Sequence, residues 1–223
     1  MTRFPTIACA LALAALVAAC ASSPPVPDWQ GNARSAMDRA IAAYLSGDSA
    51  VADVEFRRAR AEIARTGRTD LLARVELMRC AARVASLVFE RCEGFERLAP
   101  DAEAAERAYA DYLAARVAPA DIALLPSPHR AVAPASVGAD AAVEGVKGIE
   151  DPLSRLVAIG VLFQAGRASP PAIALAADTA SSQGWRRPLL AWLSVQLALA
   201  EKAGNAQEAE RLRRRVGVVQ DSR

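Results

Sequence analysis

The stretch Ala42–Ala59, AAYLSGDSAVADVEFRRA, decides how this chain of 223 residues folds. It begins with an apolar helical segment, passes through a short polar turn that contains Gly47, and continues as a second helical segment. In the second segment, small and aromatic side chains return every three or four residues, which is the period of an α-helix with one buried face. Because glycine readily takes the backbone conformation that ends a helix, the stretch predicts two antiparallel helices joined by a tight turn.

Two later stretches repeat this order of helix, glycine-containing turn and helix. They are LFQAGRASPPAIALAA around Gly166 and LAEKAGNAQEAERLRR around Gly204. No segment shows a convincing alternation of apolar and polar residues, which would be typical of a β-strand. We therefore expect an all-α protein of antiparallel helix hairpins, stacked as a solenoid or packed as an irregular bundle.

The first hairpin resembles the tetratricopeptide repeat. With Gly47 as the turn glycine, Ala52, Phe56 and Ala59 occupy the small, aromatic and small positions of that repeat's second helix. The resemblance implies that pairs of helices stack on one another and form an extended concave surface.

The other two copies depart from the repeat. Gly166 and Gly204 are 38 residues apart, whereas the family period is about 34. In the last copy, Arg213 stands where the repeat has a large apolar residue. A plain bundle of helix hairpins, with small residues where the helices cross, is the alternative.

The clearest single helix begins at Thr69 and Asp70, a residue pair that favours a helix N-cap. Apolar side chains follow at intervals of three and four residues, and polar side chains share the opposite face. The apolar stripe is Leu71, Val75, Met78, Ala82, Ala85 and Phe89, and the polar face is Glu76, Arg79, Arg83, Ser86 and Glu90.

Helices resume in the last third of the chain. Asp151 before Pro152 predicts a helix start, and so does Asn205 three residues before Glu208. The segment Arg186–Ala203 is apolar around most of its circumference and predicts a central, buried helix.

Prolines 119, 126, 128 and 134 interrupt the helical pattern between the two halves of the chain. We therefore expect a Pro-rich loop excursion over 118–135, between an N-terminal helical half, 31–117, and a C-terminal helical half, 136–223. The pattern leaves open whether the two halves form one continuous domain.

Residues 1–19 have the composition of a secretory signal peptide. Arg3 precedes an uncharged run from Ile7 to Ala19. As a helix this run would be roughly 20 Å long, too short for a hydrocarbon core of about 30 Å. A basic start, a short apolar run and small residues before a break are typical of a secretory signal that is removed.

The junction Val17–Cys20, VAAC, resembles the lipobox of bacterial lipoproteins. The resemblance implies cleavage before Cys20, lipidation of its thiol, and anchoring of the chain to a membrane through acyl chains such as palmitate. Ala21 follows in place of the aspartate that retains such proteins at the inner membrane, which implies outer-membrane anchoring, with the periplasm as the expected side. Residues 20–30, with three prolines, then predict an extended tether. An incidental cysteine beside an ordinary cleavage site is the alternative.

Few residues could carry catalysis. His129 is the single histidine, which excludes multi-histidine metal sites, and we expect it to be a solvated loop residue. Neither a GxSxG motif nor a phosphate-binding or dinucleotide-binding glycine motif is present. Glu103 and Glu106, beside Arg107, predict a solvated helix face. We therefore expect no catalytic, metal-binding or cofactor-binding residue, no cofactor, and no enzymatic activity.

Charge gives no sign of a nucleic-acid partner, because 27 basic residues nearly balance 25 acidic ones.

Cys80 and Cys92 are a candidate disulfide, although twelve residues of straight helix would place them about 18 Å apart. A disulfide needs Cα atoms within about 7 Å, so the bond requires the chain to turn back soon after Phe89. An oxidising envelope favours the bond, and the alternative is a packed Cys80 with a free thiol at Cys92.

These features favour a lipoprotein that serves as a protein–protein interaction or scaffold module, with another envelope protein as its partner. Trp29, Trp185 and Tyr112 are the expected contact residues. The alternative is an envelope hydrolase or a ligand-binding lipoprotein that acts on cell-wall material, with a polar pocket near 118–135 and His129.

Overall fold

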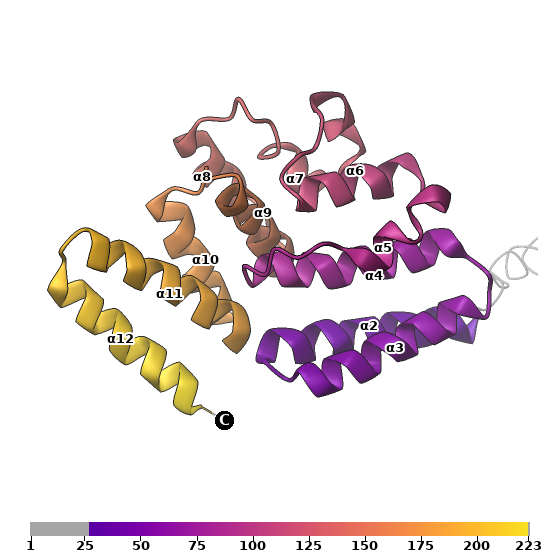
Figure 1. Ribbon diagram of the computed structural model, residues 1–223, viewed down its shortest axis with the longest axis horizontal. Helices are drawn as coiled ribbons and strands as arrows, with labels where there is room; N and C mark the ends of the chain where they lie inside the picture. Colours follow the sequence, from indigo (N-terminus) through magenta and orange to yellow (C-terminus); the bar gives the residue numbers. More distant parts are fainter. Residues whose placement is uncertain (1–26, 223) are drawn as a thin grey trace, which may run out of the picture.

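A computed structural model describes residues 27–222, and the statements below refer to this range. All regular secondary structure within it is helical, which confirms the all-α prediction (Figure 1). The signal peptide, the lipobox and Cys20 lie outside the described residues. The helix α2, Asp28–Ser46, already includes the last three residues of the expected tether, so the prediction of an extended chain up to residue 30 was wrong there.

The first predicted hairpin consists of α2 and α3, Ser49–Ala64. Gly47 between them has a φ of 102°, in the left-handed region where an L side chain would be strained. Asp48 then caps α3, because its carboxylate accepts a hydrogen bond of 3.0 Å from the Val51 backbone N–H. The glycine and the cap together reverse the chain in two residues.

The helix α4, Thr69–Ala85, lies in the middle of the molecule. It packs against α3 and α2 on one side and against α6, Ala104–Leu113, and α9, Pro152–Gln164, on the other (Figure 1). Because α4 has neighbours on both sides, Glu76 on its expected polar face is only 4 % exposed. Met78, on its expected apolar stripe, is 39 % exposed. Because α4 lies between two layers of helices, the burial of its residues does not follow the apolar and polar faces predicted from the sequence.

The remaining helices follow in chain order and complete the stack. They are α5 (Glu93–Glu96), the 3₁₀ helix η1 (Ala99–Asp101), the 3₁₀ helix η2 (Pro119–Leu124), α7 (Ser127–Arg130), α8 (Ala139–Lys147), α10 (Pro170–Ser182), α11 (Arg186–Lys202) and α12 (Ala206–Asp221). The other two predicted hairpins are α9–α10 and α11–α12, whose turns contain Gly166 and Gly204 at φ 69°. Within the described residues, no helix is both long enough and apolar enough to cross a membrane.

One buried apolar cluster runs from Ala73 on α4 to Leu212 on α12 and thus includes residues from both predicted halves. The Pro-rich stretch between the halves contributes Leu125 and Val132 to it, both almost fully buried. The expectation of a loop excursion at 118–135 was therefore wrong in part, because this stretch forms two short helices and fills the core. A smaller buried cluster joins α2 and α3 to α4.

The helix α11 links the C-terminal helices to the first hairpin. The Trp192 indole N–H donates a hydrogen bond of 3.1 Å to the Ala85 carbonyl at the end of α4. The Arg187 guanidinium donates to the Tyr44 carbonyl and lies over the Tyr44 ring. At its other end, α11 leaves Leu199 41 % exposed, so the predicted burial along its whole length was wrong.

Candidate functional site

A groove with mainly apolar walls lies between α2 and α4. Its first part is a cavity of about 620 Å³ that begins beside Trp29, in the first turn of α2. Its walls are the facing sides of the two helices, together with Ile63 of α3 and Arg68, and they carry mainly apolar side chains. The apolar residues of these walls are Trp29, Ala33, Met37, Ile63, Leu71, Val75 and Met78.

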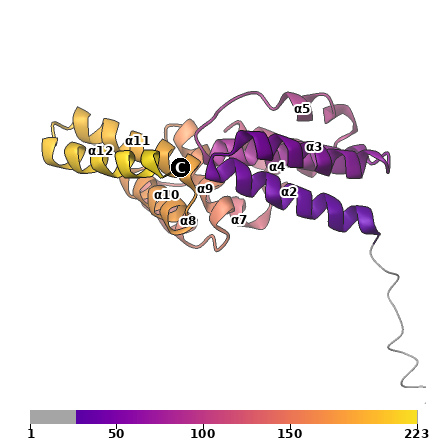
Figure 2. The same ribbon diagram turned by 90° about the horizontal axis from the view of Figure 1, so that it is seen from below.

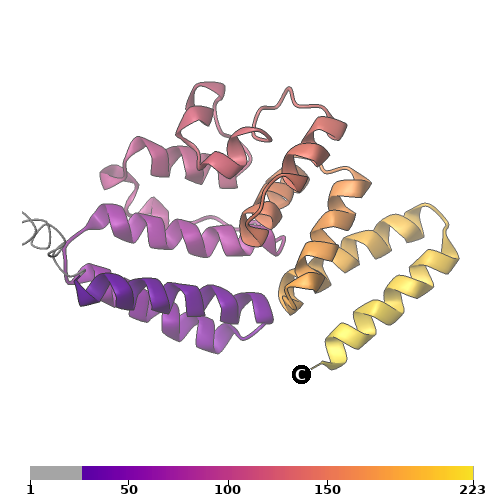
Figure 3. The same cartoon turned by 180° about the vertical axis from the view of Figure 1, so that it is seen from behind.

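The groove continues as a second cavity of about 560 Å³, which shares Asp38 and Met78 with the first. Here α9, which packs against α4 (Figure 3), joins α2 and α4 in the walls, and Trp185 also lines this part. The apolar residues of this part are Ile41, Ala42, Leu45, Ala81, Tyr109, Pro152, Leu153, Val157 and Trp185. We call the two cavities together the α2–α4 groove. Its length and apolar walls suit a partner segment rather than a small polar molecule.

Charged residues stand at defined places along the α2–α4 groove. Arg34, Arg68 and Arg74 line the part near Trp29. Asp38 lies in the middle, and Asp151 lines the part near Trp185. The groove therefore has a basic end and an acidic end.

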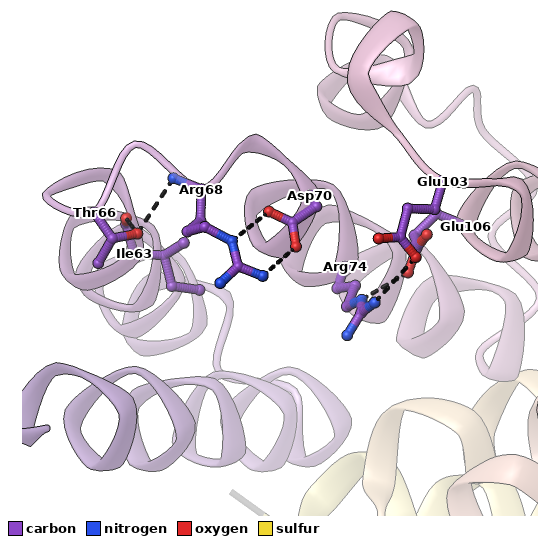
Figure 4. Close-up of polar contacts among 7 residues, drawn as sticks. All are labelled: Ile63, Thr66, Arg68, Asp70, Arg74, Glu103 and Glu106. Atoms are coloured by element: carbon purple, nitrogen blue, oxygen red, sulfur yellow. Dashed lines mark hydrogen bonds and ion pairs between the residues drawn. The ribbon is translucent and has the colours of Figure 1, made fainter. Parts of the chain in front are cut away.

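Two of the three arginines at the basic end are fixed by acidic neighbours (Figure 4). Arg68 donates two hydrogen bonds, of 2.8 Å and 2.6 Å, to the carboxylate of Asp70, and this contact lowers the pKa of Asp70 to about 2. Arg74 donates a hydrogen bond of 2.6 Å to Glu106 on α6. Arg34 has no ion pair within the described residues.

A second, polar cavity of about 640 Å³ lies between α3, α4 and the segment 90–97. We call it the arginine cavity. Figure 2 shows α5 and its flanking segment on the side of α3 and α4 that faces away from α2. The charged residues of the cavity are Asp53, Arg57, Arg60, Glu76, Arg79, Arg83, Glu90, Arg91, Glu93 and Arg97.

The carboxylate of Glu76 forms the base of the arginine cavity. It pairs with Arg60 of α3, and Gly94 of the covering segment lies directly over it. A Cβ atom at position 94 would collide with this carboxylate. A side chain at position 94 would therefore require the Glu76 carboxylate to move.

The structure joins Cys80 and Cys92 by a disulfide, with Cα atoms 6.0 Å apart. The chain turns back earlier than the sequence pattern indicated, because α4 ends at Ala85 and Leu87 takes a positive φ of 59°. Phe89 thus lies in the returning segment rather than on the helix. The disulfide holds this segment against α4 and forms part of the wall of the arginine cavity.

His129 is buried, not solvated, so that expectation was wrong. Only 2 % of it is exposed, and its ring packs against Tyr109 and Tyr112. The Tyr112 hydroxyl lies 3.2 Å from His129 Nδ1, within hydrogen-bond distance. Burial lowers the pKa of His129 to about 4 and raises the pKa of Tyr112 far above its usual range. His129 is therefore a neutral packing residue at physiological pH.

The three expected contact aromatics have different environments. Trp29 and Trp185 are half-buried and line opposite ends of the α2–α4 groove. Tyr112 is 1 % exposed, so the prediction that it contacts a partner was wrong.

The acidic pair of α6 also differs from the expectation. Glu103 is exposed, but Glu106 is buried and paired with Arg74. One of its carboxylate oxygens, Oε2, has no hydrogen-bond partner within the described residues. No group of three or more metal-ligating side chains occurs in the described part of the chain.

Sequence reasoning missed the α2–α4 groove as a whole. Ile41 and Met78 look like ordinary core positions, and only the distance between α2 and α4 leaves them accessible along a groove. One signal was available, since Trp29 lies in the expected tether 20–30 and so has no place in a predicted core.

Comparisons of the chain with protein-family models, with curated proteins and with solved structures returned no significant match.

Proposed function

We propose that this protein is a lipid-anchored interaction module of the bacterial envelope and that its α2–α4 groove binds an amphipathic helix of another envelope protein. The observation that carries the proposal is the groove itself, an apolar channel with an accessible Met78 at its middle and a tryptophan at each end. Methionine and tryptophan are enriched where proteins bind one another, because they adapt their shape and bury a large apolar area.

An amphipathic helix fits the geometry of this groove. Its walls are helices, so their side chains form rows into which the side chains of a third helix can pack. The partner's apolar residues, spaced three and four apart, would contact Ile41 and Met78.

The charges indicate the orientation of the partner. Arg34 at the Trp29 end attracts an acidic residue, and Asp38 with Asp151 attracts a basic residue toward the Trp185 end. Complementary charges of this kind fix the register and raise the association rate more than they raise affinity. We therefore expect a partner helix with an acidic end and a basic end.

Photo-crosslinking in cells tests the docking surface. A photoreactive residue in place of Met78 is expected to form an adduct with one apolar, helix-forming peptide of an envelope protein, which mass spectrometry identifies. The same residue in place of Val54, which is 53 % exposed on α3, is the matched control and should not capture that peptide. Equal capture from both positions, or unrelated peptides from Met78, would contradict the proposal.

Mass spectrometry of the mature N-terminus tests the anchor separately. The VAAC junction supports a chain that begins at a lipidated Cys20, and two or more acyl chains would make the attachment stable. We expect the mass of a chain cleaved before Cys20 with acyl groups added. An unmodified Cys20 would end the lipoprotein assignment but would leave the groove proposal standing.

The hydrolase alternative finds no supporting observation. His129 is packed against two tyrosines and lines neither the α2–α4 groove nor the arginine cavity.

A further inference from the structure

We propose that the arginine cavity is a binding site for a phosphate group. This site is separate from the α2–α4 groove, because it lies on the α5 side of α3 and α4 (Figure 2). The proposal therefore does not depend on the partner helix.

The lining of the cavity has an excess of positive charge. Six arginines and four acidic residues line it, and one of these arginines, Arg91, pairs with Glu96 just outside the lining, which leaves a net charge of +1. The arginines come from three different segments, namely α3, α4 and the segment 90–97, so their guanidinium groups approach the cavity from several directions.

Three of these arginines are held by acidic neighbours within the lining. Arg60 pairs with the buried Glu76, and the Arg79 guanidinium lies 2.8 Å from Asp53. Arg83 pairs with Glu90 at 2.9 Å. These contacts fix the side chains in place without using all of their N–H groups, since a guanidinium carries five donors.

Arg57 and Arg97, unlike these three arginines, have no acidic partner in the described part of the chain. Within the described residues, neither side chain has an ion pair or a hydrogen bond, although both line the cavity, one from α3 and one from the end of the covering segment. Glu93 is the only acid of this lining that lacks an ion pair within the same residues. The cavity thus has two guanidinium groups on different walls that form no ion pair within the described residues, against one such carboxylate.

The chemistry favours a phosphate. Guanidinium groups bind phosphate oxygens with paired hydrogen bonds, which a dianion can accept from two arginines at once. A cavity of about 640 Å³ has room for more than the phosphate alone, within the range of about 300–1,000 Å³ that small-molecule sites occupy. The ligand is therefore a phosphate monoester, either on a soluble molecule or as a lipid headgroup.

Isothermal titration of the full chain with inorganic phosphate at constant ionic strength tests the site. Arg57→Gln and Arg97→Gln are each expected to weaken binding at least fivefold, and the double variant should abolish it. Arg58→Gln is the matched control, because Arg58 lies next to Arg57 on α3 but pairs with Glu55 and does not line the cavity. Neither Arg57 nor Arg97 holds a structural partner within the described residues, so thermal unfolding of the variants should match that of the wild type.

Vesicles distinguish the two sources of the phosphate. Binding to vesicles that contain phosphatidic acid, but not to pure phosphatidylcholine vesicles, with loss in the double variant, would identify a lipid headgroup. Binding of inorganic phosphate without vesicle binding would identify a soluble phosphate ester. The proposal is overturned if the double variant binds phosphate as the wild type does, or if chloride at equal ionic strength competes as well as phosphate.

Discussion

Buried polar side chains mark the places where single residues depart from the sequence pattern. Glu76, Glu106 and His129 were all expected on solvated surfaces, yet each is at most 6 % exposed. Each is buried by a segment distant in sequence: Glu76 by the segment around Gly94, Glu106 by Arg74 of α4, and His129 by the tyrosines of α6. Local periodicity carries no information about such neighbours, so these positions could not be predicted from it.

The burial of His129 makes stability depend on pH. Its pKa is about 4 in the folded protein, compared with 6.5 for the unperturbed side chain. Between these values the unfolded chain binds a proton that the folded protein does not, so stability is highest above pH 6.5 and falls as the pH drops toward 4. Over that window this one group accounts for ~3 kcal/mol.

Urea unfolding at pH 7 and pH 4.5 measures this effect. His129→Gln should be less stable than the wild type at pH 7, yet it should lose about 2 kcal/mol less on acidification, because glutamine does not titrate. Equal losses in the two proteins would show that His129 does not contribute to acid sensitivity.

At the scale of helices, the sequence indicated where the chain turns but not how the helices pack. Gly47, Gly166 and Gly204 mark real hairpin turns, because the left-handed turn is a local requirement. Asp151 and Asn205 cap their helices as expected, accepting backbone hydrogen bonds of 2.7 Å and 3.1 Å. The burial of the 118–135 stretch was missed, since it follows from the tertiary contacts of Leu125 and Val132 and not from their immediate neighbours.

The crossing of α4 and α9 depends on Gly160. A Cβ at this position would lie 2.5 Å from the Val84 carbonyl oxygen, which is backbone and cannot move aside easily. Gly160→Ala should therefore push the helices apart and cost about 1–3 kcal/mol of unfolding free energy.

Gly217→Ala on α12 is the control for this substitution. A Cβ added at this position would have no atom of the described residues within 4 Å. Replacing a helical glycine there should be neutral or stabilising by up to about 1 kcal/mol. If denaturant unfolding shows the same change for both variants, the close approach of α4 and α9 is not a determinant of stability.

The disulfide between Cys80 and Cys92 fixes the segment after α4 to the helix that it leaves. Cross-linking a loop of this size restricts the unfolded chain, so Cys80→Ser with Cys92→Ser should lower stability by about 2–3 kcal/mol. Reductant should produce a similar loss in the wild type and no change in the double variant, as measured by urea unfolding. If the unfolding free energy of the wild type were the same with and without reductant, this stabilising role of the disulfide would be contradicted.

The whole molecule is a curved stack of helices in which α11 returns to the first hairpin (Figure 1). Arg187 on α11 contacts Tyr44 at the end of α2, and Trp192 reaches the end of α4. This closure brings Trp185 to one end of the α2–α4 groove while Trp29 lines the other. The sequence predicted helix pairs and two of the aromatic residues at the groove. It could not predict the groove, which depends on how three helices from distant parts of the chain are placed.

The central claim is that the α2–α4 groove binds an amphipathic helix. Its most direct test is the affinity of a synthetic copy of the peptide captured from Met78, measured by isothermal titration against the full chain. Met78→Glu places a charge in the middle of the groove and should weaken binding at least tenfold, whereas Val54→Glu on the outer face of α3 should leave the affinity unchanged. Equal affinity of the peptide for both variants would contradict the account.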